Sequence, residues 1–186
     1  MPRSGEDARR RLQQAALELY RERGFESTTA AEIAERAGVN ARTFFRHFPD
    51  KREVLFDGEA DLRDALTRYI AEAPAGLPPV EVTLNAFRRA AYILEDNRAF
   101  SEPRLALIAE TPTLRERDLA KGEAMAVTVA EGLRRRGVAG RPADLVARTG
   151  WAAFHHAAQD WVADPGSSLD THLVRTFADL RALFAA

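Results

Sequence analysis

The 186-residue sequence predicts an all-α fold of about nine helices. Apolar residues recur at helical spacing along almost the whole chain, and no stretch shows the sustained apolar–polar alternation of a half-buried strand. Gly and Pro residues break this pattern at intervals that separate one helix from the next. Because 46% of the residues are hydrophobic, the chain can build a core, and disorder of the whole chain is excluded.

The first two helices are short and clearly bounded. One is predicted over residues 6–23, where apolar residues form a single stripe, and Gly24 follows it as a typical residue after a helix C-terminus. The next begins at Thr29, because Thr29 and Glu32 have the spacing of a capping box, in which each side chain satisfies a free backbone N–H group. Gly38 ends this second helix.

A third helix is predicted over residues 41–47, capped by Asn40 and stopped by Pro49. The second and third helices, joined by the turn at 37–40, fit a helix-turn-helix, whose last helix lies in the major groove of DNA. Phe44 and Phe48 are expected in the core. The outer face then carries polar side chains suited to base edges and phosphates, namely Arg42, Thr43, Arg46 and His47.

A family resemblance covers about residues 8–56. The stretch resembles the N-terminal domain of the TetR family of regulators, because many positions match without a gap, among them AALELY, RGF, IAERAGV and HFPDK. The resemblance implies a homodimer on double-stranded operator DNA and a C-terminal domain that binds a small effector. In most members the protein is a repressor that its ligand releases. The expected operator is nearly palindromic, because two recognition helices about 34–36 Å apart read two half-sites.

The resemblance also implies roles for single residues. Thr29 matches a residue that meets a phosphate, Arg42, Thr43 and His47 match recognition-helix positions, and Lys51 matches a frequent phosphate contact at the start of the fourth helix. Two alternatives stay open: Thr29 as a helix cap alone, and Lys51 as a solvated side chain.

Two departures from the family pattern affect the recognition helix. Asn40-Ala41-Arg42 stands where Ser-Lys-Gly is common, and Phe45 stands where Tyr is common. Phe45 cannot donate a hydroxyl hydrogen bond to phosphate, so we expect Arg42 to supply part of the lost affinity.

The rest of the chain predicts further helices near 50–72, 80–97, 100–110, 113–136, 142–163 and 168–184. We expect two domains, a DNA-binding domain over 1–50 and a helical ligand-binding and dimerisation domain over 51–186. The last two helices carry apolar lines, one of them through Leu169, Leu173, Phe177, Leu180 and Phe184. The resemblance implies that this helix pair packs against its mate in a homodimer.

The expected effector site lies between the fourth, fifth, seventh and eighth helices. Its candidate residues are aromatic, aliphatic or Met side chains that suit an adaptable apolar cavity and hence a mainly hydrophobic effector. They are Leu62, Leu66, Phe87, Ala91, Leu94, Met125, Val129, Trp151 and Phe154. The alternative for each is an ordinary place in the core.

Other functional classes find little support in the sequence. There is no Cys, His155 and His156 point about 100° apart on a helix, and we expect no metal, cofactor or catalytic site. Two alternatives stay open beside the ligand-gated repressor: an effector-independent regulator and an activator of the same fold.

Charge and hydropathy favour a cytoplasmic protein without a membrane partner. The formal net charge is −1, but residues 1–52 hold 11 basic and 8 acidic side chains, a mild excess with the sign that DNA binding requires. The first residues lack the apolar core of a signal peptide, and no stretch approaches the roughly 18–20 apolar residues of a membrane span.

Overall fold

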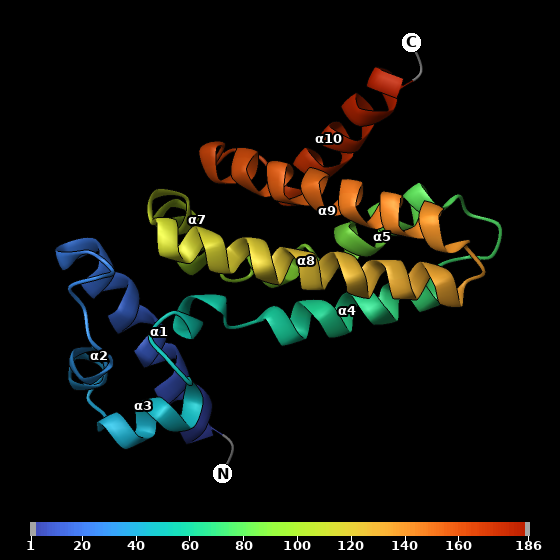
Figure 1. Ribbon diagram of the computed structural model, residues 1–186. Helices are drawn as coiled ribbons and strands as arrows, with labels where there is room; N and C mark the ends of the chain where they lie inside the picture. The colour runs from blue at the N-terminus through green and yellow to red at the C-terminus, as the bar shows by residue number, and fades with distance from the viewer. Residues whose placement is uncertain (1–2, 185–186) are drawn as a thin grey trace. The chain divides into compact units, whose positions relative to one another are not determined.

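The computed structural model describes residues 3–184 and the side chains of residues 5–183, so the side chain of Phe184 lies outside the described part. All regular structure in this part is helical, which confirms the predicted all-α fold (Figure 1). The elements are α1 (Arg3–Arg23), α2 (Ala30–Arg36), α3 (Ala41–His47), the 3-10 helix η1 (Glu53–Phe56), α4 (Glu59–Glu72), α5 (Pro79–Ala90), α6 (Tyr92–Glu95), α7 (Arg98–Glu110), α8 (Pro112–Arg135), α9 (Gly140–Ala163) and α10 (Leu169–Phe184).

Two of the expected helices are interrupted. The expectation of one helix over 50–72 is wrong, because Gly58 has a φ of 94° and separates η1 from α4. A left-handed residue cannot continue an α-helix, and Gly adopts this conformation without steric cost. The helix expected over 80–97 divides at Ala91, whose N–H bonds to Arg88 O at 3.3 Å in the tighter 3-10 pattern.

Packing divides the chain into two compact units. The first unit comprises Met1–Asp57 and Ala99–Glu116, and the second comprises Gly58–Arg98 and Arg117–Ala186. This division by packing therefore places 51–57 and 99–116 with the N-terminal helices, which differs from the expected functional division at residue 50.

The first unit holds α1, α2 and α3 around one apolar core (Figure 1). Ile33 of α2 and Phe44 of α3 are fully buried in it. Phe100, Ile108 and Leu114 join the same core from the 99–116 segment. The core that buries α2 and α3 therefore includes side chains that lie far from them in the sequence.

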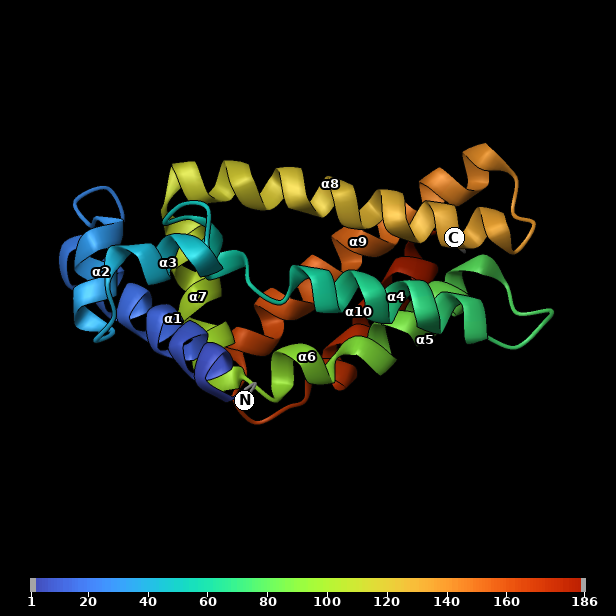
Figure 2. The ribbon, with the colours of Figure 1, turned by 90° about the horizontal axis from the view of Figure 1, so that it is seen from below.

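In the second unit α10 packs on α9 and α5, and α4 packs on α5 (Figure 2). Its core includes Leu66, Phe87, Val129 and Phe177, each at most 1% exposed. Arg136 binds the C-terminal end of α4, because its guanidinium donates to the carbonyl group of Ile70 in the last turn and to those of Ala73 and Pro74 just past the helix end. Over the described residues, none of the helices combines the length and apolarity needed to cross a membrane.

Candidate functional site

The start of α2 has the predicted capping box. Thr29 Oγ1 accepts the Glu32 N–H at 3.2 Å, and the Glu32 carboxylate accepts the Thr29 N–H at 2.8 Å and its hydroxyl at 2.7 Å. These bonds, helped by Arg23, hold the pKa of Glu32 below its usual value. Thr29 is exposed, yet both of its donor groups are engaged by Glu32, so a phosphate would have to share or displace that carboxylate.

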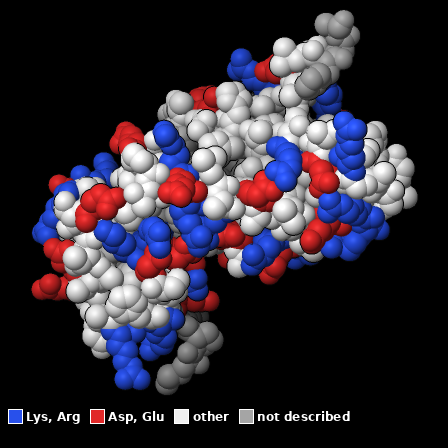
Figure 3. All heavy atoms as spheres, in the orientation of Figure 1, with Lys and Arg blue, Asp and Glu red and all other residues white. Residues whose placement is uncertain are grey.

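Helix α3 presents a polar face to solvent. Asn40 Oδ1 accepts the Thr43 N–H at 2.8 Å, as expected of the cap. Phe44 is buried on the inner face, whereas Arg42 and Arg46 are exposed on the opposite face and Thr43 is half-buried. In Figure 3 basic side chains gather at the α3 end of this unit. The helix therefore offers two guanidinium groups to an anionic partner.

Phe45 is the exposed aromatic residue of α3. It is 57% exposed, and its ring meets Phe44 edge-on at a centroid distance of 5.2 Å. The inner Phe44 thus supports a ring that is available to a partner of α3.

His47 is turned partly inward. Its Nε2 is buried and has no hydrogen-bond partner among the described residues. The pKa of His47 lies below its usual value because burial disfavours the imidazolium, and Arg46 and Arg9 act in the same direction against Asp57. A neutral imidazole with a buried Nε2 can offer DNA at most its other ring atoms.

Lys51 is enclosed by backbone carbonyl groups. Its Nζ donates to Phe25 O at 2.8 Å, Glu26 O at 3.2 Å and Thr28 O at 2.9 Å, and it lies 4.3 Å from the centroid of the Phe25 ring. The Tyr20 hydroxyl donates to the carbonyl oxygen of Lys51 at 2.5 Å. A phosphate contact by this ammonium group would require it to give up bonds that it already makes.

The nine candidate effector residues all lie in the second unit. Seven are buried, and Leu94 and Trp151 are half-buried. Phe87, Trp151 and Phe154 form an aromatic cluster, in which Trp151 and Phe154 stack at 5.2 Å and Phe87 and Phe154 lie 4.9 Å apart. The structure therefore brings candidate residues of α5 and α9 into contact, and their rings pack against one another.

Sequence reasoning missed two participants in this cluster. Phe177 of α10 lies 6.3 Å from Phe87, because Leu169, Leu173 and Phe177 of the expected apolar line face the chain's own core. Gly122 of α8 lies against Trp151, and a Cβ atom at Gly122 would stand 2.5 Å from the indole Nε1. A Gly inside a predicted helix is the signal that could have indicated this close approach.

Two of the cavities elsewhere on the second unit are lined by α9 and α10. One, of about 380 Å³, has an apolar lining from α5, α9 and α10 that includes Val80, Leu145 and Phe177. The other, of about 640 Å³, lies between α9 and α10 and includes His156 and His172. Neither is lined by the candidate effector residues.

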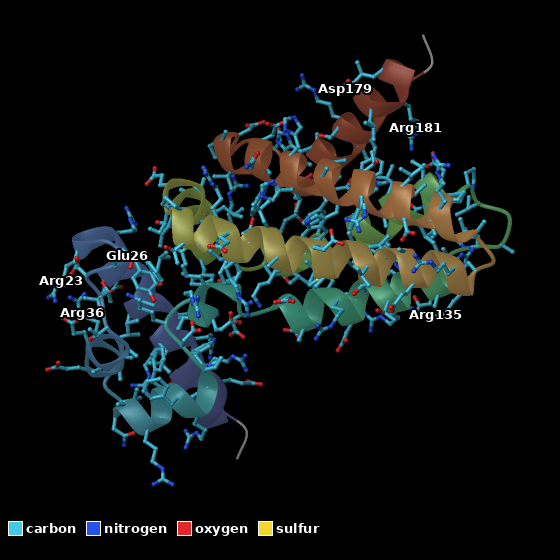
Figure 4. The ribbon with its side chains drawn as sticks, viewed as in Figure 1. Arg23, Glu26, Arg36, Arg135, Asp179 and Arg181 are labelled. Carbon is cyan, nitrogen blue, oxygen red and sulfur yellow. The ribbon has the colours of Figure 1, made fainter. Side chains whose placement is uncertain are left out.

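The outer faces of α9 and α10 carry exposed apolar side chains. Leu145 is 58% exposed, Val174 41% and Leu183 76%, whereas Leu169 and Leu173 are fully buried within the chain. On α10, Arg181 pairs with Glu81 of α5 at 2.6 Å (Figure 4). The exposed apolar side chains of these two helices are therefore different residues from Leu169, Leu173 and Phe177 of the predicted apolar line.

Within the described part of the chain, no group of three or more His, Asp or Glu side chains is arranged to hold a metal ion.

Family models match most of the chain. The model described as "Bacterial regulatory proteins, tetR family" matches residues 12–57, and the model described as "MftR C-terminal domain" matches residues 77–185.

Curated relatives agree with these models. The chain is 33% identical over 123 residues to the HTH-type transcriptional regulator TcmR of Streptomyces glaucescens. The aligned part covers 63% of this chain and 54% of TcmR. It is 33% identical over 73 residues to the HTH-type transcriptional regulator HbdR of Aromatoleum sp. (strain CIB), where the aligned part covers 39% of this chain and 31% of HbdR. The chain thus spans about half the length of TcmR and less of HbdR.

Solved structures extend the similarity over nearly the whole chain. Thermus thermophilus FadR, a TetR-family transcriptional repressor solved in complex with lauroyl-CoA, has a TM-score of 0.58 and 33% identity, covering 95% of this chain and 93% of that one. A TetR-family protein from Syntrophomonas wolfei, with a TM-score of 0.69 and 16% identity over 97% of this chain and 96% of that one, supports the fold alone. Since family models match both parts of the sequence and a repressor matches it almost end to end, the chain belongs to the TetR family of bacterial regulatory proteins, a family of DNA-binding regulators rather than enzymes.

Proposed function

We propose that the chain is a transcriptional repressor that binds a near-palindromic operator as a homodimer and is released by a small, mainly apolar effector. In this proposal residues 1–50 carry DNA binding, and residues 51–186 carry effector binding and dimerisation. The observation that carries it is helix α3, which is anchored by the buried Phe44 and presents Arg42 and Arg46 to solvent.

DNA reading is assigned to the exposed side of α3 and the start of α2. Arg42 and Arg46 can reach base edges or phosphates, and Thr43 can reach a base from its half-buried position. Thr29 contributes to phosphate binding by sharing its hydroxyl with Glu32, and His47 contributes through its exposed ring atoms. Because phosphate contacts release counterions, binding should weaken steeply as salt increases.

Dimerisation is assigned to α9 and α10. Leu145, Val174 and Leu183 are large apolar side chains left exposed on these two helices. A second copy that covers them would remove apolar surface from water, which is the main driving force of association. A two-fold pair would place two α3 helices on successive major grooves of a near-palindromic site.

The effector is assigned to the aromatic cluster and its neighbours from α4 to α9. Trp151 is half-buried and stacked on Phe154, so its movement would open apolar surface to a ligand. The similar Thermus thermophilus repressor was solved with lauroyl-CoA, and a fatty acyl thioester of coenzyme A is therefore the first effector that we propose for this chain, with the acyl chain as the apolar part that enters the cluster.

The test begins with a duplex that the full-length protein selects from a random-sequence library. Arg42→Ala and Thr43→Ala should each weaken binding of that duplex by about 1–3 kcal/mol if the side chain reads a base. Arg135→Ala is the matched control, since Arg135 is an exposed arginine on α8 (Figure 4). Selection without a common sequence, or wild-type binding by both α3 variants, would contradict DNA reading by α3.

Lauroyl-CoA is then added to the protein–duplex complex, with coenzyme A and lauric acid as controls. Release by lauroyl-CoA alone is the expected result, since a ligand shifts the equilibrium only by its difference in affinity for the two states. Sequence-specific binding that no acyl-CoA disturbs would favour an effector-independent regulator instead.

A further inference from the structure

The chain has only two lysines among its 27 basic residues, and both are held in place. Lys121 pairs with Glu59 in the second unit, and Lys51 is enclosed in the first. Every other residue of the Lys and Arg total is arginine.

The surroundings of Lys51 provide one backbone acceptor for each N–H group of its ammonium. The group has three N–H donors, and three carbonyl oxygens, of Phe25, Glu26 and Thr28, lie 2.8–3.2 Å from Nζ. The Phe25 ring covers the charge at 4.3 Å. An ammonium directs its three donors from one compact nitrogen, whereas a guanidinium spreads five donors over a larger planar group, so arginine would need a different arrangement of the Phe25 ring and the three carbonyl groups.

These bonds join three parts of the first unit. The carbonyl groups belong to the segment that leads from α1 to Thr29, the cap of α2, and Glu26 marks its place in Figure 4. The lysine itself lies three residues beyond Phe48, where α3 ends. The Tyr20 hydroxyl ties the Lys51 backbone to α1, and burial raises the pKa of Tyr20, so this hydroxyl stays a donor.

We propose that Lys51 is a positioning residue, which fixes the start of α2 and the end of α3 for DNA and makes no phosphate contact itself. Movement of the ammonium to a phosphate would leave the carbonyl groups of the 25–28 segment without this partner, and Phe25 and Thr28 are buried. The proposal rests on the operator binding proposed above and assigns a different role to the residue that the family resemblance places on phosphate.

The first test compares Lys51→Arg, Lys51→Met and Arg42→Met on the selected duplex over a range of salt concentrations. Lys51→Arg keeps the charge but not the three-carbonyl geometry. We expect it to lose affinity on the order of tenfold, the equivalent of one charged hydrogen bond, by the same factor at every salt concentration. Lys51→Met should behave in the same way. Arg42→Met should instead lower the salt slope, which is the slope of the logarithm of affinity against the logarithm of salt concentration, by about 1.8 per dimer if Arg42 meets one phosphate in each half-site.

Two results would overturn the positioning role. In the first, Lys51→Arg binds like the wild type and Lys51→Met lowers the salt slope by about 1.8 per dimer, which is the signature of a direct phosphate contact. In the second, neither Lys51 variant changes affinity or thermal stability. If the wild type itself shows no sequence-selective, salt-dependent binding, the proposed function fails instead, so the two failures are distinguishable.

A second measurement needs no Lys51 variant and remains decisive if those variants do not fold. The wild-type protein labelled with 15N-lysine gives two side-chain ammonium signals, and Lys121→Arg identifies the one from Lys51. We expect the Lys51 signal to show slow proton exchange without DNA and to remain unchanged in the complex. A coupling between Lys51 Nζ and a phosphate 31P in the complex would refute the inference.

Discussion

Replacement of Gly122 by Ala tests how tightly α8 and α9 pack around the candidate effector cluster. The added Cβ would stand 2.5 Å from Trp151 Nε1, whereas ordinary contact begins near 3.4 Å, so the indole must retreat by about 1 Å. Trp151 stacks on Phe154 at 5.2 Å, which leaves the ring little free space on that side. Overpacking of this kind costs about 1–3 kcal/mol, and the higher helix propensity of Ala offsets about 1 kcal/mol of that cost.

The free energy of unfolding of Gly122→Ala should therefore fall by up to about 2 kcal/mol. A change of 1 kcal/mol moves Tm by about 2–4 °C in a chain of this size, so thermal unfolding followed by circular dichroism resolves the loss. Tryptophan emission should change as well, because Trp151 is half-buried at the site of the substitution, while the other tryptophan, Trp161, is 1% exposed and lies further along α9.

The matched control is Gly5→Ala in α1, where an added Cβ meets nothing within 4 Å. This control should keep or slightly raise stability through helix propensity alone. If Gly122→Ala gains about 1 kcal/mol and keeps the wild-type emission spectrum, the reasoning from close approach is refuted.

Three further predictions concern other contacts. Phe45→Tyr should raise operator affinity, by about 0.5–1.5 kcal/mol for one hydroxyl hydrogen bond to phosphate, and an unchanged dissociation constant in a gel-shift titration would argue against that contact. Folding lowers the pKa of His47, so its neutral form contributes stability that is present above about pH 6.5 and is lost as pH falls through the folded pKa. His47→Gln should flatten this loss in urea titrations at different pH values. Equal pH profiles of the variant and the wild type would exclude a contribution from His47. Arg136→Met should lower the free energy of unfolding by about 1–3 kcal/mol, because the carbonyl groups at the C-terminal end of α4 lose a charged donor, and an unchanged urea midpoint would contradict this role.

Features set by neighbouring residues could be predicted from the sequence. The Thr29–Glu32 capping box and the Asn40 cap are present because each joins groups only three residues apart. The burial of Phe44 and exposure of Arg42 follow from helical periodicity alone.

Features that depend on distant residues could not be predicted in the same way. The partners of Lys51 lie 23–26 residues earlier in the chain, and their convergence requires the folded positions of α1 and the loop after it. Likewise, local periodicity identifies 100–110 as helical, but the packing of Phe100 and Ile108 with α1–α3 is a property of the folded unit. The lowered pKa of His47 depends first on its burial, and two of the charges that act on it, Arg9 and Asp57, come from separate parts of the first unit.

Because lysine is scarce, a protease that cuts after lysine can cleave the chain at few positions. A lysine-specific endoprotease has two cleavage sites in this sequence, after Lys51 in the first unit and after Lys121 in the second. Since both side chains are hydrogen-bonded in the folded state, cutting at either site requires local opening of the unit that contains it. Digestion under native conditions would then yield fragments that end at residue 51 or at residue 121, and their relative rates would report the opening free energy of each unit separately.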